Sequence, residues 1–386
     1  MGTRDQAKTT PPSPDRLLSI DALRGFDMFW IIGGDTLLRA LAHAADWPFQ
    51  GGIDEQLEHA EWEGFRFYDL IFPLFLFLVG VVLPFSLGKL QEHGEARSRT
   101  YWRIFRRTVL LFALGLVYNH FLQLGFYTPP LGFDFSAVRV AGVLQRIAVC
   151  YGVAALVVLH TGVRGRVAIT AALLLGYWAL LALVPAPGSA PGDYSRYGNL
   201  AGYVDAHYLP GKILAEYYGY GDNEGLLSTV PAVGTALLGA LAGQWLRAGG
   251  RSGTWKVLGL AGAGVISLLL GWAWGLSFPI IKNLWTSSFV LFAGGWSLLL
   301  LALFYGVIDV LRWRAWAFFF VVIGANAITA YLLPHVIDFE KVGHFFLGGV
   351  ERHAGAFGPV VAALGVLAAE WLLLLYLYRR RLFLRV

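Results

Sequence analysis

The chain has 386 residues, of which 57% are hydrophobic and 14% charged, whereas soluble globular proteins carry about 25% charged residues. This composition excludes a disordered chain, a coiled coil and an ordinary soluble enzyme. The single cysteine, Cys150, excludes an internal disulfide and a multi-cysteine metal site, and we expect no metal. The formal net charge of +5 comes from basic residues between apolar segments, so we expect no nucleic-acid partner.

Ten segments are apolar and long enough to cross a bilayer, which takes about 20 residues. Their uniform apolar character excludes barrel strands, which alternate with a period of two. We therefore predict an all-α, polytopic membrane protein, with a cytoplasmic tail at 1–17 and a single transmembrane domain at 18–386. The predicted spans are 18–42, 66–88, 101–122, 138–159, 165–185, 226–246, 255–276, 284–310, 315–335 and 358–378.

The distribution of basic residues predicts the orientation of these spans. If the N-terminus is cytoplasmic, the inner segments hold 20 of the 30 Lys and Arg residues and the outer segments hold 7. This bias follows the positive-inside rule and places both termini in the cytoplasm. The outer loops are then an acidic, aromatic one near 43–65 and a tyrosine-rich one near 186–225, whose tyrosines form either an interfacial belt or a sugar-stacking surface.

The first predicted span contains charged residues, which are costly inside a bilayer and often functional. On an unbroken helix, Asp21, Arg24 and Asp35 share one face, with about 21 Å of rise between the two aspartates. Asp21 and Arg24 favour a structural ion pair at i, i+3 near the inner surface. Asp35, with Gly33 and Gly34 beside it, is the better candidate for a ligand or a catalytic partner.

The loop that leads into the second span contains His59 between acidic residues. A histidine beside carboxylates can exchange a proton near neutral pH, although a plain surface histidine is the simpler interpretation. Asp69 opens the second span and could cap its N-terminus.

Further polar residues lie within or at the ends of later spans. Arg146 in the fourth span needs an anion, from either a carboxylate or a ligand phosphate. Lys282 and Asn283 lie at the outer membrane edge. In the ninth span, Asn326 can make hydrogen bonds between helices, and we expect Pro334 to kink the helix near its outer end.

Six fragments, in the same order, resemble the transmembrane acetyltransferases typified by heparan-α-glucosaminide N-acetyltransferase, in particular shorter bacterial members. The resemblance runs from about residue 17 to the C-terminus. The fragments are SIDALRGFDMFW, EHAEWEGFRFYDLIFPLFLFLVG, RVAGVLQRIAVCY, NEGLLSTVPAVGTALLGALAGQWL, FPIIKNLWTSSFVL and GANAITAY.

The resemblance implies transfer of an acetyl group from cytosolic acetyl-CoA to the amine of a glucosamine-type sugar outside the membrane. It implies that His59 is the essential histidine, within His59-Ala-Glu-Trp-Glu-Gly64. The assisting asparagine of the lysosomal enzyme corresponds here to Asp35, so a carboxylate replaces an amide and cannot donate a hydrogen bond unless protonated. A bacterial plasma membrane location and a homodimer also follow from the resemblance.

The resemblance also suggests which residues hold each of the two substrates. The basic residues proposed to hold the CoA phosphates are Arg24, Arg106, Arg107, Arg146 and Arg247. The residues proposed for the acceptor are Trp62, Asp69, Lys282, Asn283 and Asn326. His59 acts either as a general base or as an acetyl carrier. The alternative function is a transporter or flippase for a sugar or a lipid-linked sugar, since intramembrane charges and a broken helix suit that class as well.

Overall fold

The structure is a computed structural model that describes residues 17–92, 94–119, 138–213 and 221–384. The predictions for most of the N-terminal tail, for the end of the third span and for residues 214–220 of the second outer loop fall outside these ranges. The described residues form helices and no strand, apart from isolated bridges between Glu63 and Ile281 and between Arg139 and Gly211. The all-α prediction is confirmed for these residues.

The described residues of the first half of the chain form eight α-helices and two short turns of other helix types. They are α1 (Leu18–Phe29), α2 (Asp35–Ala44), α3 (Gln50–Gln56), α4 (Ile71–Glu92), α5 (Arg97–Val117), α6 (Val143–His160), α7 (Val163–Leu183) and α8 (Leu200–Tyr208), with a π-helical turn at Trp30–Gly34 and a 3₁₀ turn at Phe67–Leu70.

The second half continues with α10 (Leu226–Arg247), α11 (Gly253–Gly275), α12 (Ser287–Phe304), α13 (Ala317–Ala325), α14 (Ala327–Leu332), α15 (Phe339–His353) and α16 (Gly358–Arg379), with a π-helical turn at Tyr305–Val310 and 3₁₀ turns at Leu333–His335 and Gly355–Phe357.

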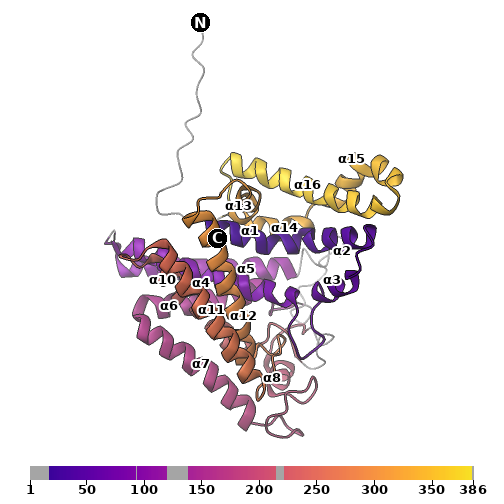
Figure 1. The fold of residues 1–386 in the computed structure, drawn as a ribbon. Helices are drawn as coiled ribbons and strands as arrows, with labels where there is room; N and C mark the ends of the chain where they lie inside the picture. The colour runs from indigo at the N-terminus through magenta and orange to yellow at the C-terminus, as the bar shows by residue number, and fades with distance from the viewer. Residues whose placement is uncertain (1–16, 93, 120–137, 214–220, 385–386) are drawn as a thin grey trace.

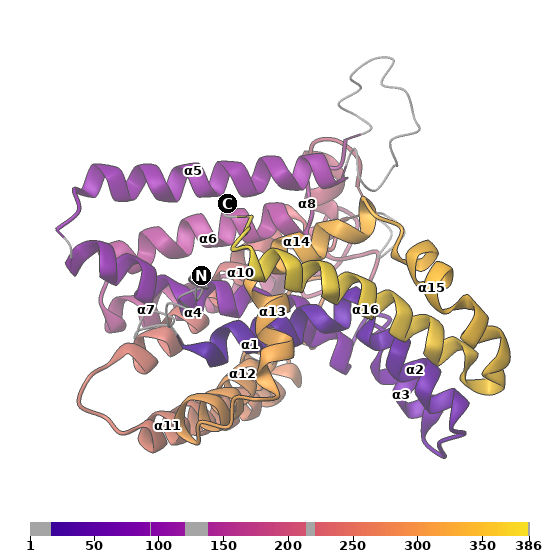
Figure 2. The same ribbon diagram turned by 90° about the horizontal axis from the view of Figure 1, so that it is seen from above.

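The helices form a bundle around α4 and α10. Figure 1 shows α15 and α16 along one side of the molecule, next to α1 and α2, with α7 on the opposite side. Figure 2 shows α5 and α6 side by side at one edge and α11 and α12 paired at the other. Helix α4 is apolar on every face because it runs through the centre, where Leu74, Phe77 and Val81 are fully buried.

Seven helices of the described chain are long and apolar enough to span a membrane, or eight if a bent pair counts as one span. The protein is therefore a multi-pass membrane protein, but the predicted number of ten and the sides of the termini are not confirmed. The first and third predicted spans do exist as helical segments. The first is interrupted by the turn at Trp30–Gly34, and α5 carries five arginines that lower its hydropathy.

Two predictions of local geometry were wrong. The bend of the ninth span lies at Asn326, where the segments Ala317–Ala325 and Ala327–His335 meet at 75°, and not at Pro334, which lies in the final 3₁₀ turn. The predicted shared face of Asp21, Arg24 and Asp35 assumed an unbroken helical period. The turn at Trp30–Gly34, with Gly33 at φ +122°, changes that period. Arg24 and Asp35 consequently line different cavities.

Helices α4 and α10 approach closely because glycines lie at their crossing. A Cβ atom on Gly239 would lie 1.9 Å from the Phe77 carbonyl oxygen, and one on Gly80 would lie 1.9 Å from that of Ala236. Gly243 faces Val81 in the same way, so α10 carries a Gly-x-x-x-Gly contact of the kind common between membrane helices. This contact fixes the position of α4, one face of which lines the cavities described below.

We predict that Gly239→Ala lowers the midpoint of thermal unfolding in detergent, because the added methyl group overlaps backbone and such overpacking costs about 1–3 kcal/mol. The matched control is Gly262→Ala on α11, where a Cβ would meet nothing within 4 Å. This control should leave the midpoint unchanged or slightly raised. Equal midpoints for the two variants would contradict the close approach of α4 and α10.

Candidate active site

The loop before α4 holds His59 against the carboxylate of Asp69. His59 Nδ1 lies 2.9 Å from Asp69 Oδ1, while Asp69 Oδ2 accepts hydrogen bonds from the backbone N–H groups of Ala60 (3.1 Å) and Arg66 (3.0 Å). The Asp69 side chain is fully buried, whereas that of His59 is 48% exposed. Asp69 thus caps the turn before α4, as predicted, and it also orients the imidazole.

A turn between α11 and α12 brings a lysine to the same place. The Thr286 side chain accepts from the Ile281 N–H (3.1 Å) and donates to the Pro279 carbonyl (2.8 Å), which closes the turn. The Gly64 N–H donates to the Ile280 carbonyl at 2.9 Å, so the His59 loop is attached to this turn. Residues that are far apart in sequence therefore meet at the mouth of the bundle.

Lys282 lies between the histidine and the aspartate. Its Nζ is 2.8 Å from His59 Nδ1, 3.2 Å from His59 Nε2 and 3.3 Å from Asp69 Oδ1. Burial lowers the pKa of the Lys282 ammonium, and the neighbouring Asp69 carboxylate opposes that shift. The three side chains form a compact group of acid, base and cation, which suits a reaction that moves a proton and develops negative charge.

This group lines a cavity of about 210 Å³ with mostly apolar walls. We refer to it as the His59 cavity. Its polar lining residues, besides His59 and Lys282, are Tyr68, Asn223, Glu224 and Tyr331. The Tyr68 ring lies 5.1 Å from the His59 ring, measured between centroids. A mostly apolar pocket with a few converging polar groups is the usual form of a small-molecule site.

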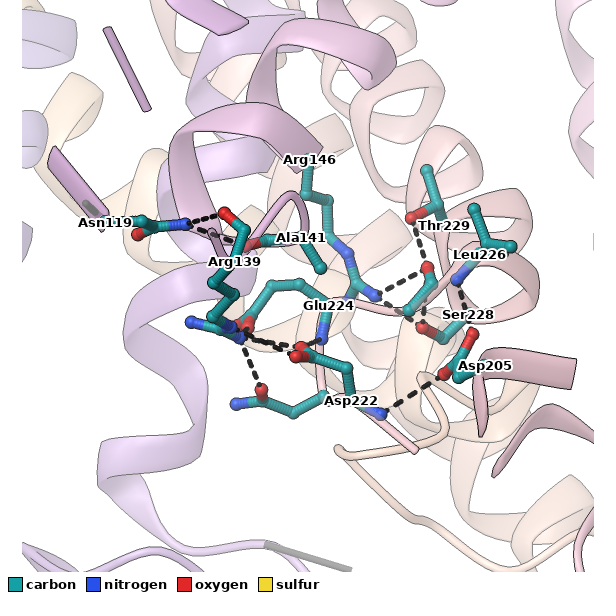
Figure 3. Close-up of polar contacts among 12 residues, drawn as sticks. Asn119, Arg139, Ala141, Arg146, Asp205, Asp222, Glu224, Leu226, Ser228 and Thr229 are labelled. Atoms are coloured by element: carbon teal, nitrogen blue, oxygen red, sulfur yellow. Dashed lines mark hydrogen bonds and ion pairs between the residues drawn. The ribbon is translucent and has the colours of Figure 1, made fainter. Parts of the chain in front are cut away.

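A buried ion cluster holds one wall of the His59 cavity in place (Figure 3). Arg139 Nη2 lies 2.6 Å from Asp222 Oδ1 and 2.5 Å from Glu224 Oε2. Asp205 accepts from the backbone N–H groups of Leu226 (2.8 Å) and Asp222 (3.3 Å), which fixes the start of α10. Burial raises the pKa of the Glu224 carboxyl, and the charge of Arg139 opposes that shift.

A second cavity, of about 400 Å³, continues from the first toward the other end of the bundle. We refer to it as the arginine cavity, since Arg24 and Arg107 line it. The two cavities share the lining residues Phe75, Leu144, Ile147, Ala327 and Ile328.

One face of α4 lines both cavities. Residues of this face recur every three or four positions, from Ile71 in the His59 cavity to Ser86 in the arginine cavity. The rise between these two residues is about 22 Å, most of the ~30 Å hydrocarbon thickness. The two cavities thus lie next to each other along α4, with His59 at one end and Arg24 and Arg107 at the other, and we refer to them together as the path.

The structure brings several of the predicted residues to this path. His59 and Lys282 line its one end, with Asp69 directly behind them. Arg24 and Arg107 line the other end, where Arg24 also pairs with Asp21 at 3.6 Å, as predicted. Asn326 lines the arginine cavity too, and its Oδ1 has no hydrogen-bond partner among the described residues.

Other predicted phosphate ligands lie elsewhere. Arg106 points outward from α5, and Arg247 pairs with Glu92 at the end of α10. Arg146 is 2% exposed, donates to Ser228 on α10 and lies over the ring of Trp285, and it lines none of the cavities described here.

Two of the residues predicted to bind the acceptor, Trp62 and Asn283, line none of these cavities. Trp62 donates from Nε1 to the Tyr194 carbonyl at 2.9 Å and so joins the two outer loops. Asn283 follows Lys282 in the turn but lines none of the cavities described for the chain. Asp35 lines a third cavity beside the first, so the carboxylate that orients His59 is Asp69.

Sequence reasoning missed Glu224. The acidic run Asp222-Asn-Glu224 directly before a membrane span was a signal for it, because charges at that position call for a buried partner. Tyr331 is noticeable in the sequence as a polar residue of the ninth span, but no pattern there predicts that it lines the cavity of His59.

The fold and the site together define a multi-pass helical membrane protein in which His59, Asp69 and Lys282 lie at one end of the path. No family model matches the chain. The chain is 26% identical to heparan-alpha-glucosaminide N-acetyltransferase of Homo sapiens over 426 aligned positions, covering 97% of this chain and 60% of the relative. The enzyme of the same name from Mus musculus is 26% identical, with 99% and 62% covered. The chain is related to these enzymes and spans about 60% of their length.

We predict that Arg139→Ala lowers the free energy of unfolding by about 3–5 kcal/mol, because it leaves two buried carboxylates without their cation. The loss should shrink at low pH, where both carboxylates become protonated. The control is Arg103→Ala, whose pair with Glu95 leaves Arg103 60% exposed and should cost less than ~1 kcal/mol. Unfolding in detergent at two pH values measures both effects, and equal losses in the two variants would contradict the buried cluster.

Proposed function

We propose that the protein transfers an acetyl group from acetyl-CoA on the cytoplasmic side to the amine of a glucosamine-type sugar on the outer side. The observation that carries the proposal is the path that links Arg24 and Arg107 to His59. Acyl transfer across a membrane needs such a path, because a charged nucleotide cannot cross the bilayer while a thin thioester arm can lie between helices. The relatives' names support the reaction class.

The arginine cavity is the proposed site for the phosphate end of CoA. Guanidinium groups bind phosphate with two parallel hydrogen bonds, and Arg107 is additionally held over the Tyr151 ring at 4.6 Å. The pantetheine arm then lies along α4 toward His59. The unpaired Oδ1 of Asn326 is suited to accept a hydrogen bond from one of its amide N–H groups.

The proposed chemistry at the other end uses three side chains. Asp69 holds the imidazole, and His59 removes a proton from the attacking amine. A bond forms between the amine nitrogen and the acetyl carbon, the carbon–sulfur bond breaks, and the CoA sulfur leaves as a thiolate that is then protonated. The Lys282 ammonium, 2.8 Å from the histidine, is placed to stabilise the oxyanion that forms on the acetyl oxygen.

Lys282 thereby answers a difficulty that the sequence raised. Asp35 replaces an amide and cannot donate to the thioester carbonyl, whereas an ammonium group donates readily. Direct transfer and an acetyl-histidine intermediate both remain consistent with this arrangement. Only the second produces ping-pong kinetics.

The proposed setting is a bacterial plasma membrane, with ten spans, both termini in the cytoplasm and one transmembrane domain over 18–386. His59 then faces the outside, where the acceptor sugar is presented, and surrounding lipid covers the exposed apolar side chains of α7 and α11. A homodimer is part of the proposal on the basis of the sequence resemblance.

A transporter for a sugar remains the second candidate, favoured by the 75° break at Asn326. The names of the relatives favour the transferase over the transporter.

We predict that the detergent-purified protein transfers labelled acetyl from acetyl-CoA to glucosamine, and that His59→Ala lowers the rate about 10²–10⁴-fold because the general base is lost. Asp35→Asn should retain part of the activity if the amide of the relatives can do the same work. Acetyl-CoA binding without transfer would point to another acceptor amine. Absence of both binding and transfer would favour the transporter.

We predict that Arg107→Ala raises the KM for acetyl-CoA about tenfold or more, since a charge-assisted contact contributes about 1.5–3 kcal/mol. Its neighbour Arg106 provides the matched control, because it carries the same charge but points away from the cavity. Arg106→Ala should leave the KM within twofold of the wild type. Equal effects of the two substitutions would mean that the arginine cavity does not bind CoA.

A further inference from the structure

A third cavity, of about 650 Å³, lies beside the His59 cavity. It is formed by the turn at Trp30–Gly34, the start of α2, residues 334–340 and α16. Ile31 lines both this cavity and the His59 cavity, so the two cavities are neighbours. The volume lies within the range of about 300–1,000 Å³ that is typical of small-molecule sites.

The charges that line this cavity are negative. Its lining includes Asp35, Asp338, Glu340 and Glu370, together with His335, and none of its lining residues in the described chain is Lys or Arg. Asp338 is committed to the start of α15, where it accepts from the Lys341 N–H at 3.0 Å and pairs with the Lys341 ammonium at 2.9 Å. Asp35 lies at the start of α2 and is half-buried.

Glu370 is the most unusual of these carboxyl groups. It lies in the middle of α16, its residue is 1% exposed, and its Oε1 has no hydrogen-bond partner among the described residues. A buried carboxyl group is costly to ionise without a partner, and an ionisable residue inside a membrane helix calls for a functional explanation. A cation bound in the cavity would supply the missing partner.

The cation is better explained as an organic ammonium ion than as a metal ion. Among the described residues no three His, Cys, Asp or Glu side chains converge closely enough to hold a metal. The remaining walls are apolar and include Ile32, Val336 and Val366. Apolar walls with a few carboxylates suit a sugar ring that carries an ammonium group.

The His59 cavity offers an ammonium ion less than this one does. Of the carboxylates at that cavity, Glu224 is bound by Arg139 and Asp69 by Lys282. Lys282 also lies against His59, so a second cation is disfavoured at the site of reaction. An amine acceptor is largely an ammonium ion near neutral pH, and it has to lose a proton before it can attack. Separate cavities for the ammonium form and for the reacting amine follow from this difference in available carboxylates.

We propose that the cavity around Asp35 and Glu370 binds the ammonium form of the acceptor sugar before its amine passes Ile31 to reach His59. This inference rests on the proposed function and names a second site for the same substrate. It also explains how substrate and product are distinguished, because acetylation removes the positive charge that the carboxylates bind.

The test compares the binding of glucosamine and of N-acetylglucosamine to the detergent-purified protein without acetyl-CoA, by isothermal titration calorimetry. Wild-type protein should bind glucosamine at least tenfold more tightly than its neutral acetylated counterpart. Equal binding of the two sugars to the wild type would overturn the proposal without the need for any variant.

Variants locate the site. Glu370→Gln should abolish the preference for glucosamine while acetyl-CoA binding persists, which shows that the variant is folded. If Glu370→Gln does not fold, Asp35→Asn takes its place. Glu351→Gln on α15 makes the same charge change outside the cavity and should keep the preference. Glucosamine binding by Glu370→Gln at the wild-type level would overturn the proposal.

The same variants separate this proposal from the proposed function. If Glu370→Gln transfers acetyl with an unchanged KM for glucosamine, the ammonium site is wrong and the acetyltransferase stands. If the wild type prefers glucosamine by charge but neither binds acetyl-CoA nor transfers acetyl, the ammonium site stands and the function is wrong.

Discussion

The arrangement depends on one buried carboxylate, that of Asp69. It accepts hydrogen bonds from two backbone N–H groups of the preceding loop, contacts the His59 imidazole and pairs with the Lys282 ammonium. A fully buried carboxylate needs all of these partners, because each unpaired charge in such a place is costly. The need to satisfy one aspartate therefore assembles a site from segments 223 residues apart.

The path through the bundle has mostly apolar walls. One face of α4 lines the path from end to end. Glycines at the crossing of α4 and α10 allow these two helices to pack closely. Its charged lining residues are Glu224 and Lys282 in the His59 cavity and Arg24 and Arg107 in the arginine cavity, and Asn326 lies where the helix breaks. A mainly apolar path with cations at one end and a base at the other suits a ligand with a charged head and a thin reactive tail.

The sequence predicted the helical class, the membrane helices with uniform hydropathy and the Asp21–Arg24 pair, because these depend on local pattern alone. It also singled out His59 and Lys282 individually. It could not predict that they meet, since their contact is made by a turn and a loop with no periodic signal. Asp35 was placed wrongly relative to Arg24 because a π-helical turn shifts the period, and Arg146 could not be recognised as a packing residue without its contacts to Ser228 and Trp285.

The most direct test of the account is whether donor and acceptor can react from opposite sides of a membrane. Proteoliposomes would be loaded with glucosamine, and labelled acetyl-CoA would be added outside only, with His59→Ala vesicles as control. The account predicts labelled N-acetylglucosamine inside the wild-type vesicles and none in the control. Product that forms only when both substrates are on the same side would contradict a path across the membrane, even if the protein is an acetyltransferase.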